Sequence, residues 1–165
     1  MIIQHYPWLA ELSLPVILLR TALALLCAGV IGYDRDTHGA PAGFRTHILV
    51  CLGAMLAMMT GQFAYMMYPA AVEPTRIGAQ VISGIGFLGA GTIILTREHR
   101  VAGLTTAAGL WASASIGIAL GIGFYEGAII GAAAIYFTER TLRRISKRIR
   151  IVHKEEIDSE IKSGN

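Results

Sequence analysis

The sequence contains little charge and little cysteine for its length. Charged residues make up 15% of 165 positions and hydrophobic residues 54%, and the mean hydropathy is +0.56. A soluble domain has about 25% charged residues, and a soluble chain this small cannot bury so much apolar surface. Cys27 and Cys51 both lie inside apolar runs, which indicates free thiols rather than a disulfide or a metal site. The composition therefore favours a membrane protein.

Signals of catalysis, metal binding and secretion are also absent from the sequence. The N-terminal stretch MIIQHYPWLAELSLP has no positively charged segment, so it does not resemble a cleaved signal peptide. The five histidines show no ligand spacing, and no Ser–His–Asp or Cys–His pattern is present. We therefore predict that the protein is not an enzyme and has no resident metal, no cofactor and no nucleic-acid partner.

Long apolar runs predict an all-α, polytopic membrane helix bundle. The run from Leu104 to Phe137 contains 34 residues, about 51 Å as one helix, whereas a hydrocarbon core is about 30 Å thick. It therefore divides into two spans, with a turn at Gly121–Gly123. Five transmembrane spans are expected, at residues 14–33, 46–68, 76–95, 103–121 and 123–140.

The distribution of basic residues predicts the orientation. Residues 34–45, 97–100 and 140–150 carry ten Lys and Arg, and all three segments lie on one side of a five-span chain. The other side has Arg76 and, near the outer end of the first span, Arg20, which we expect to reach the interface. This bias places the N-terminus outside and the C-terminus in the cytoplasm. Residues 141–165 form a basic cytoplasmic tail, which either lies on the anionic membrane surface or is the solvated end of the fifth helix.

The stretch SGIGFLGAG contains the pattern G-x-G-x-x-G, which also occurs in dinucleotide-binding folds. No strand precedes it, and no acidic residue follows at the required distance, so that interpretation fails. Glycines in a membrane helix instead permit close helix packing, or a deformable helix near a binding site. Both alternatives apply to Gly84, Gly86, Gly89 and Gly91.

Polar residues at the start of the third span form the candidate functional core. Arg76 and Gln80 lie one helical turn apart, and polar groups at such depth normally face protein or water. We expect Arg76 to face the bundle interior or a water-filled vestibule, with Glu73 or Glu126 among its acceptors. The predicted core is Glu73, Arg76 and Gln80, together with Gly84, Gly86, Gly89 and Gly91.

A second candidate cluster lies at the cytoplasmic ends of the first two spans. It contains Asp34, Arg35, Arg45 and Thr46. Carboxylates suit Mg²⁺, but the neighbouring arginines favour ordinary ion pairing here.

Four motifs resemble those of the MgtC/SapB family of bacterial inner-membrane proteins. They are IGYDR at 31–35, AGFRTHILV at 42–50, EPTRIGAQVISGIGFLGAG at 73–91 and VAGLTTAAGLW at 101–111. Asp34 stands where the family has Glu, and Glu73 stands where it has Asp. The resemblance implies a five-span inner-membrane protein associated with growth in low Mg²⁺ and, in pathogens, with virulence.

The same resemblance implies regulation of another membrane complex, such as ATP synthase or a cation transporter, through helix–helix contacts. The alternative is a transporter or channel for Mg²⁺, another cation or a small solute. Besides the lipid bilayer, the expected partners are that complex and a second copy of the chain. Gly127 and Gly131 form a G-x-x-x-G pattern, so they are the candidate helix-packing residues of a homodimer.

Overall fold

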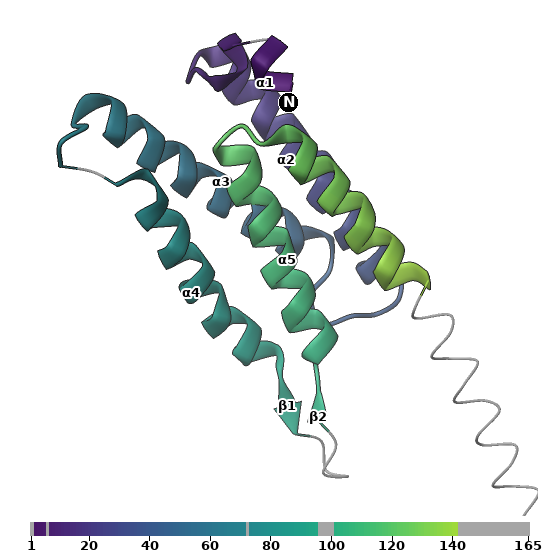
Figure 1. The fold of residues 1–165 in the computed structure, drawn as a ribbon. Helices are drawn as coiled ribbons and strands as arrows, with labels where there is room; N and C mark the ends of the chain where they lie inside the picture. Colours follow the sequence, from purple (N-terminus) through teal and green to yellow (C-terminus); the bar gives the residue numbers. More distant parts are fainter. Residues whose placement is uncertain (1, 6, 72, 96–100, 142–165) are drawn as a thin grey trace, which may run out of the picture.

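The structure, a computed structural model, describes residues 2–5, 7–71, 73–95 and 101–141 (Figure 1). A short helix α1 (Ile2–His5) and a 3-10 turn η1 (Pro7–Ala10) come first. The long helices are α2 (Leu14–Asp36), α3 (Phe44–Met67), α4 (Pro74–Thr92) and α5 (Leu104–Gly121). A last helix, which carries no label in Figure 1, covers residues 125–141.

The prediction of an all-α helix bundle is confirmed. Each of the five long helices begins and ends within three residues of an expected span. Three of them, α2, α3 and α5, are long and apolar enough to cross a membrane. The orientation of the chain stays a prediction, and the basic tail lies outside the described residues after position 141.

Glycine ends α5 where the sequence predicts a turn. The helix stops at Gly121, and Gly123 has a φ of +83°, a left-handed conformation that other residues adopt at a cost. The connection from α4 to α5 contains an element that the sequence did not predict. Strands β1 (Ile94–Leu95) and β2 (Val101–Ala102) pair antiparallel, with Ile94 opposite Ala102.

Small residues bring α3 close to both α2 and α5. In α2, Ala24 and Ala28 are fully buried, and a Cβ on Gly32 would lie 2.8 Å from the Cα of Phe44. In α5, a Cβ on Gly117 would collide with the carbonyl oxygen of Cys51. These helices therefore make close backbone contacts, as expected for a bundle in lipid. Both cysteines are free.

Helix α4 lies at the edge of the bundle and packs against α3 and α5 (Figure 1). It is unbroken from Pro74 to Thr92, so the predicted deformation is not seen. A Cβ on Gly89 would be 3.4 Å from the Cβ of Ala107, but Gly84, Gly86 and Gly91 have open space around them. Within the single chain, close helix packing is therefore seen at Gly89 and not at the other three glycines.

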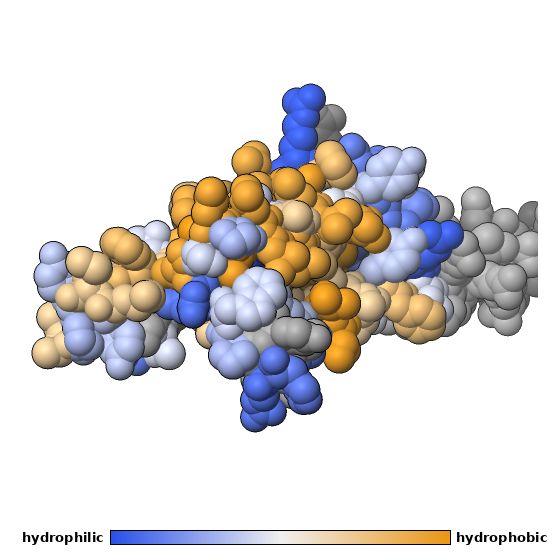
Figure 2. Space-filling model, turned by 90° about the horizontal axis from the view of Figure 1, so that it is seen from above, coloured by the Kyte–Doolittle hydropathy of each residue, from blue (hydrophilic) through white to orange (hydrophobic). Residues whose placement is uncertain are grey.

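The surface matches a protein whose middle lies in an apolar environment. Figure 2 shows hydrophobic residues gathered in the middle of the face in view, with most hydrophilic residues around its margin. Exposed large hydrophobic residues occur on every long helix; examples are Leu26, Leu56, Phe87, Trp111 and Ile130. Such continuous apolar exposure is rare on soluble monomers.

Candidate functional site

Arg20 lies in the bundle core, with none of its surface exposed. Its Nη1 donates to the carbonyl oxygen of Gly121 at 2.6 Å and to Oε1 of Gln62 at 3.1 Å, and its Nε donates to the hydroxyl of Tyr125 at 3.2 Å. Arg20, Gln62, Gly121 and Tyr125 are called the Arg20 cluster below. It connects α2 with α3, with the end of α5 and with the last helix.

The expectation that Arg20 reaches the membrane interface is therefore wrong. A buried guanidinium requires acceptors for its donors, and here a carbonyl, an amide and a phenol supply them. Gln62 also donates from Nε2 to the carbonyl oxygen of Ala10 at 2.9 Å, which attaches the N-terminal segment to the cluster.

A second buried polar cluster lies nearer the other end of the bundle. The Nη2 of Arg35 donates to Oγ1 of Thr106 at 2.8 Å. A hydrogen bond of 2.8 Å joins Nδ1 of His47 and Oγ of Ser113. All four residues are at most 6% exposed. Thr106 and Ser113 lie two turns apart on one face of α5. This face therefore supplies a hydrogen-bond partner to Arg35 of α2 and another to His47 of α3.

Gly109 lies between these two α5 residues and leaves room for an acidic side chain from the last helix. A Cβ on Gly109 would be 2.9 Å from Oε1 of Glu139 and 3.2 Å from Cε1 of His47. The buried Nε2 of His47 has no hydrogen-bond partner among the described residues. Arg35, His47, Thr106, Ser113 and Glu139 are called the inner polar cluster below.

The structure divides the predicted cytoplasmic cluster. Asp34 and Arg35 are buried, at 7% and 6% exposure, whereas Arg45 and Thr46 are exposed. Oδ1 of Asp34 lies 3.8 Å from Nδ1 of His38. Within the described part of the chain, no group of three or more His, Cys, Asp or Glu side chains is arranged to hold a metal ion.

The predicted core on α4 lies on the surface of the single chain. Glu73 accepts a hydrogen bond from the hydroxyl of Thr75, and both Arg76 and Gln80 are exposed. Arg76 therefore does not face the bundle interior, because α4 is a peripheral helix. A polar or aqueous environment for Arg76 stays a prediction.

Sequence reasoning missed Gln62 and Tyr125, and it treated Arg20 as an interfacial residue. The available signal was that both Arg20 and Gln62 interrupt apolar runs. Polar residues at such positions usually satisfy one another across helices. The hydroxyl of Thr106 accepts a hydrogen bond across helices from Arg35 of α2.

The fold and these clusters define an integral membrane protein: an all-α bundle with apolar helices of spanning length and charged side chains buried between them. The profile of the MgtC family matches residues 21–148, and the chain belongs to this family. No solved structure matches the chain significantly.

Three relatives illustrate the similarity. The chain is 36% identical over 136 residues to "Putative magnesium transporter YhiD" of Escherichia coli K12, covering 80% of this chain and 63% of that protein. It is 35% identical over 139 residues to "Protein SapB" of Bacillus subtilis, covering 82% and 60%. It is 39% identical over 132 residues to "Protein MgtC" of Salmonella typhimurium LT2, covering 80% and 54%. The chain thus spans between about half and two thirds of the length of these relatives.

Proposed function

We propose that this chain is a non-enzymatic protein of the bacterial inner membrane that supports growth at low Mg²⁺ and contributes to virulence in pathogens. It acts by binding another membrane complex, such as ATP synthase or a cation transporter, through helix–helix contacts. A relative named as a magnesium transporter supports the link to Mg²⁺. The outer face of α4 supports the mode of action.

That outer face is the observation on which the proposal rests. Ala79, Ser83, Gly86 and Ala90 are all exposed, and their spacing of four, three and four residues places them in one stripe along α4. Small residues let another backbone approach closely. Arg76 is exposed near one end of the stripe, where lipid offers it no acceptors within the hydrocarbon layer. A partner helix would cover both features.

A shallow apolar groove beside this face supports the same mode of binding. It has a volume of about 400 Å³ and lies between α3 and α4, where Gly53 and Gly84 leave space next to Leu88. Grooves of this kind accept helices that place their side chains against small residues.

Two α4 variants test this function. We expect Gly86→Leu and Arg76→Gln to abolish growth at low Mg²⁺ and co-purification of the partner, while expression stays normal. Leucine at position 86 meets no atom within 4 Å of its Cβ, so the fold is kept and only the outer face changes.

Ala22→Leu is the matched control, because Ala22 is also a small exposed residue but lies on α2. Normal growth of both α4 variants would refute the assignment of the site. Loss of growth in the control alone would move the contact surface to α2.

Transport of a cation is the second candidate function. The inner polar cluster favours it, because it places His47 and Glu139 beside each other within the bundle. Purified protein in liposomes then carries Mg²⁺, K⁺ or Na⁺, and His47→Ala reduces the flux. Absence of flux for all three ions would eliminate this candidate.

A homodimer belongs to the same proposal, since a second copy could cover an exposed glycine face. Of the two predicted residues, Gly131 is available for such a contact, whereas a Cβ on Gly127 would collide with the ring of Phe124 in the same chain. Gly131→Leu should therefore weaken self-association in detergent. An unchanged oligomer would exclude this surface.

A further inference from the structure

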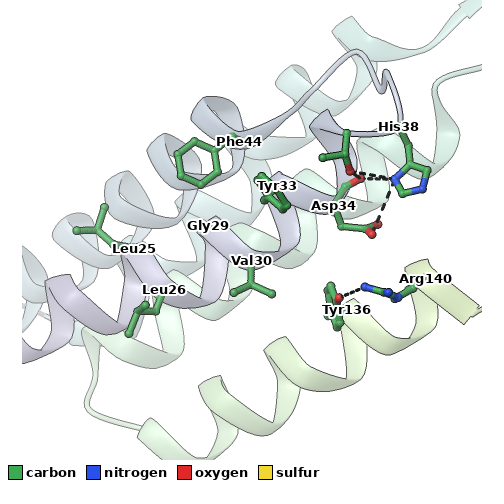
Figure 3. Close-up of a pocket in the computed structure, with 11 residues that line it drawn as sticks. Leu25, Leu26, Gly29, Val30, Tyr33, Asp34, His38, Phe44, Tyr136 and Arg140 are labelled. Atoms are coloured by element: carbon green, nitrogen blue, oxygen red, sulfur yellow. Dashed lines mark hydrogen bonds and ion pairs between the residues drawn. The ribbon is translucent and has the colours of Figure 1, made fainter.

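We propose that the groove along the second half of α2 binds one phospholipid with an amine-bearing headgroup. The groove has a volume of about 640 Å³, within the usual range for small-molecule sites. Leu25, Leu26, Gly29 and Val30 of α2 line its apolar part (Figure 3). Phe44 and Tyr136 belong to its lining from the two neighbouring helices.

The length of the groove matches one leaflet of a bilayer. Leu25 is the central residue of α2, and the lining continues to the end of the helix at Asp36 and on to Thr37 and His38. Twelve residues of helix measure about 18 Å, and half of a hydrocarbon core is about 15 Å. The groove therefore runs from the level of the bilayer centre to the headgroup region, as one acyl chain does.

The groove is also open to the surrounding lipid. Val30 is 51% exposed, and Leu26 is 63% exposed. Gly29 is buried at the floor, where a Cβ would lie 3.4 Å from the ring of Phe44. The side chains that line this part of the groove are apolar. They can contact an acyl chain, but they offer no hydrogen-bonding group to a water-soluble ligand.

The chemistry changes at the end of α2. There the lining consists of Asp34, Thr37, His38 and Arg140. Figure 3 shows Arg140 and Tyr136 on the last helix facing this end, and the guanidinium of Arg140 donates to the Tyr136 hydroxyl. Oδ1 of Asp34 lies on the α2 side, 3.8 Å from Nδ1 of His38.

This pairing of charges selects the headgroup. The guanidinium of Arg140 is suited to a phosphodiester. The carboxylate of Asp34 repels a second negative charge and accepts hydrogen bonds from an ammonium. Phosphatidylethanolamine carries both complementary groups, whereas phosphatidylglycerol has no ammonium. The positive-inside orientation places this lipid in the cytoplasmic leaflet.

Native mass spectrometry of the purified full chain tests the site. The protein in detergent is titrated with phosphatidylethanolamine or phosphatidylglycerol, and the lipids retained per chain are counted. We expect one retained phosphatidylethanolamine and weaker retention of phosphatidylglycerol. Val30→Trp fills the groove and removes this binding, and Arg140→Gln weakens it by about ten-fold through loss of a charge-assisted contact.

Two matched controls lie outside the lining. Leu18→Trp adds the same ring to an exposed position in the other half of α2, and Arg45→Gln removes the same charge from an exposed position near the end of the groove. Both should retain lipid like the unmodified protein. Circular dichroism checks that every variant keeps its helix content.

Three results would overturn the proposal. The first is no lipid retained above the level of Val30→Trp. The second is equal retention of the two phospholipids, which would refute the assigned headgroup. The third is a change from dimer to monomer in Val30→Trp with an unchanged lipid count, because a second copy would then fill the groove.

Discussion

The guanidinium of Arg20 connects the long helices at one end of the bundle. It is completely buried, and its hydrogen bonds reach an amide of α3, a carbonyl at the end of α5 and a phenol of the last helix. The carbonyl of Gly121 belongs to the turn that joins the last two helices, so Arg20 also satisfies a helix-terminal group. One side chain thus connects four helices.

Replacement of Arg20 should therefore destabilise the protein. Arg20→Met keeps much of the volume but leaves Oε1 of Gln62 and the carbonyl oxygen of Gly121 without this donor, at a cost of about 2 kcal/mol. The melting temperature in detergent should fall by about 5 °C. Arg45→Met is the control, because Arg45 is exposed, and it should leave the melting temperature unchanged. A similar decrease in both variants would contradict a specific role for the buried guanidinium.

The sequence shows that Arg20 is a charged residue within an apolar run, but it does not predict the direction of the side chain. Its position near the end of an apolar run is compatible with an interfacial side chain. Burial depends on Gln62 and Tyr125, which are 42 and 105 residues away along the chain. No local sequence pattern predicts that these three side chains meet. Arg35 was predicted to belong to a cluster with Asp34, Arg45 and Thr46, but the hydroxyl to which it donates belongs to Thr106 in another helix.

Among the helices, α5 depends most directly on small residues. Ser113, Gly117 and Gly121 are all buried on it, and Gly117 faces the backbone of α3 at Cys51. The closeness of the two helices aligns Ser113 with His47 across the interface. The hydrogen bond in the inner polar cluster therefore depends on close packing of α3 against this face of α5.

Enlarging Gly117 should separate α3 from α5. Gly117→Val places side-chain atoms against a backbone carbonyl that cannot rotate away, and overpacking of this kind costs about 3 kcal/mol. We expect a lower melting temperature in detergent and a reduced yield of folded protein. Gly86→Val, at a position with open space, should melt like the unmodified chain. Equal stability of both variants would show that α3 and α5 pack less closely than described.

The limits of the helices could be predicted because apolar run lengths and glycine turns are local properties. The turn at Gly121–Gly123 followed from the length of one run, and Gly123 has the left-handed conformation that such a turn requires. The arrangement of the helices could not be predicted in the same way. Arg76 was expected to face the bundle interior or a water-filled vestibule, but which helix is peripheral depends on packing between distant segments.

The whole molecule combines a closely packed part with an exposed edge. Helices α2, α3, α5 and the last helix surround the Arg20 cluster and the inner polar cluster. Helix α4 lies outside this arrangement (Figure 1). Its residues Arg76, Gln80 and Gly86 are exposed. Several residues of the motif at 73–91 therefore lie on the exposed edge of the bundle.

Crosslinking from α4 in living cells tests this claim most directly. A photoreactive residue replaces Ser83, in the middle of the exposed stripe of α4, and a matched residue replaces Leu18, which is 61% exposed on α2. The account predicts a protein adduct, with another membrane protein or a second copy, from position 83 and only lipid adducts from position 18. Protein adducts from position 18 with none from position 83 would contradict it.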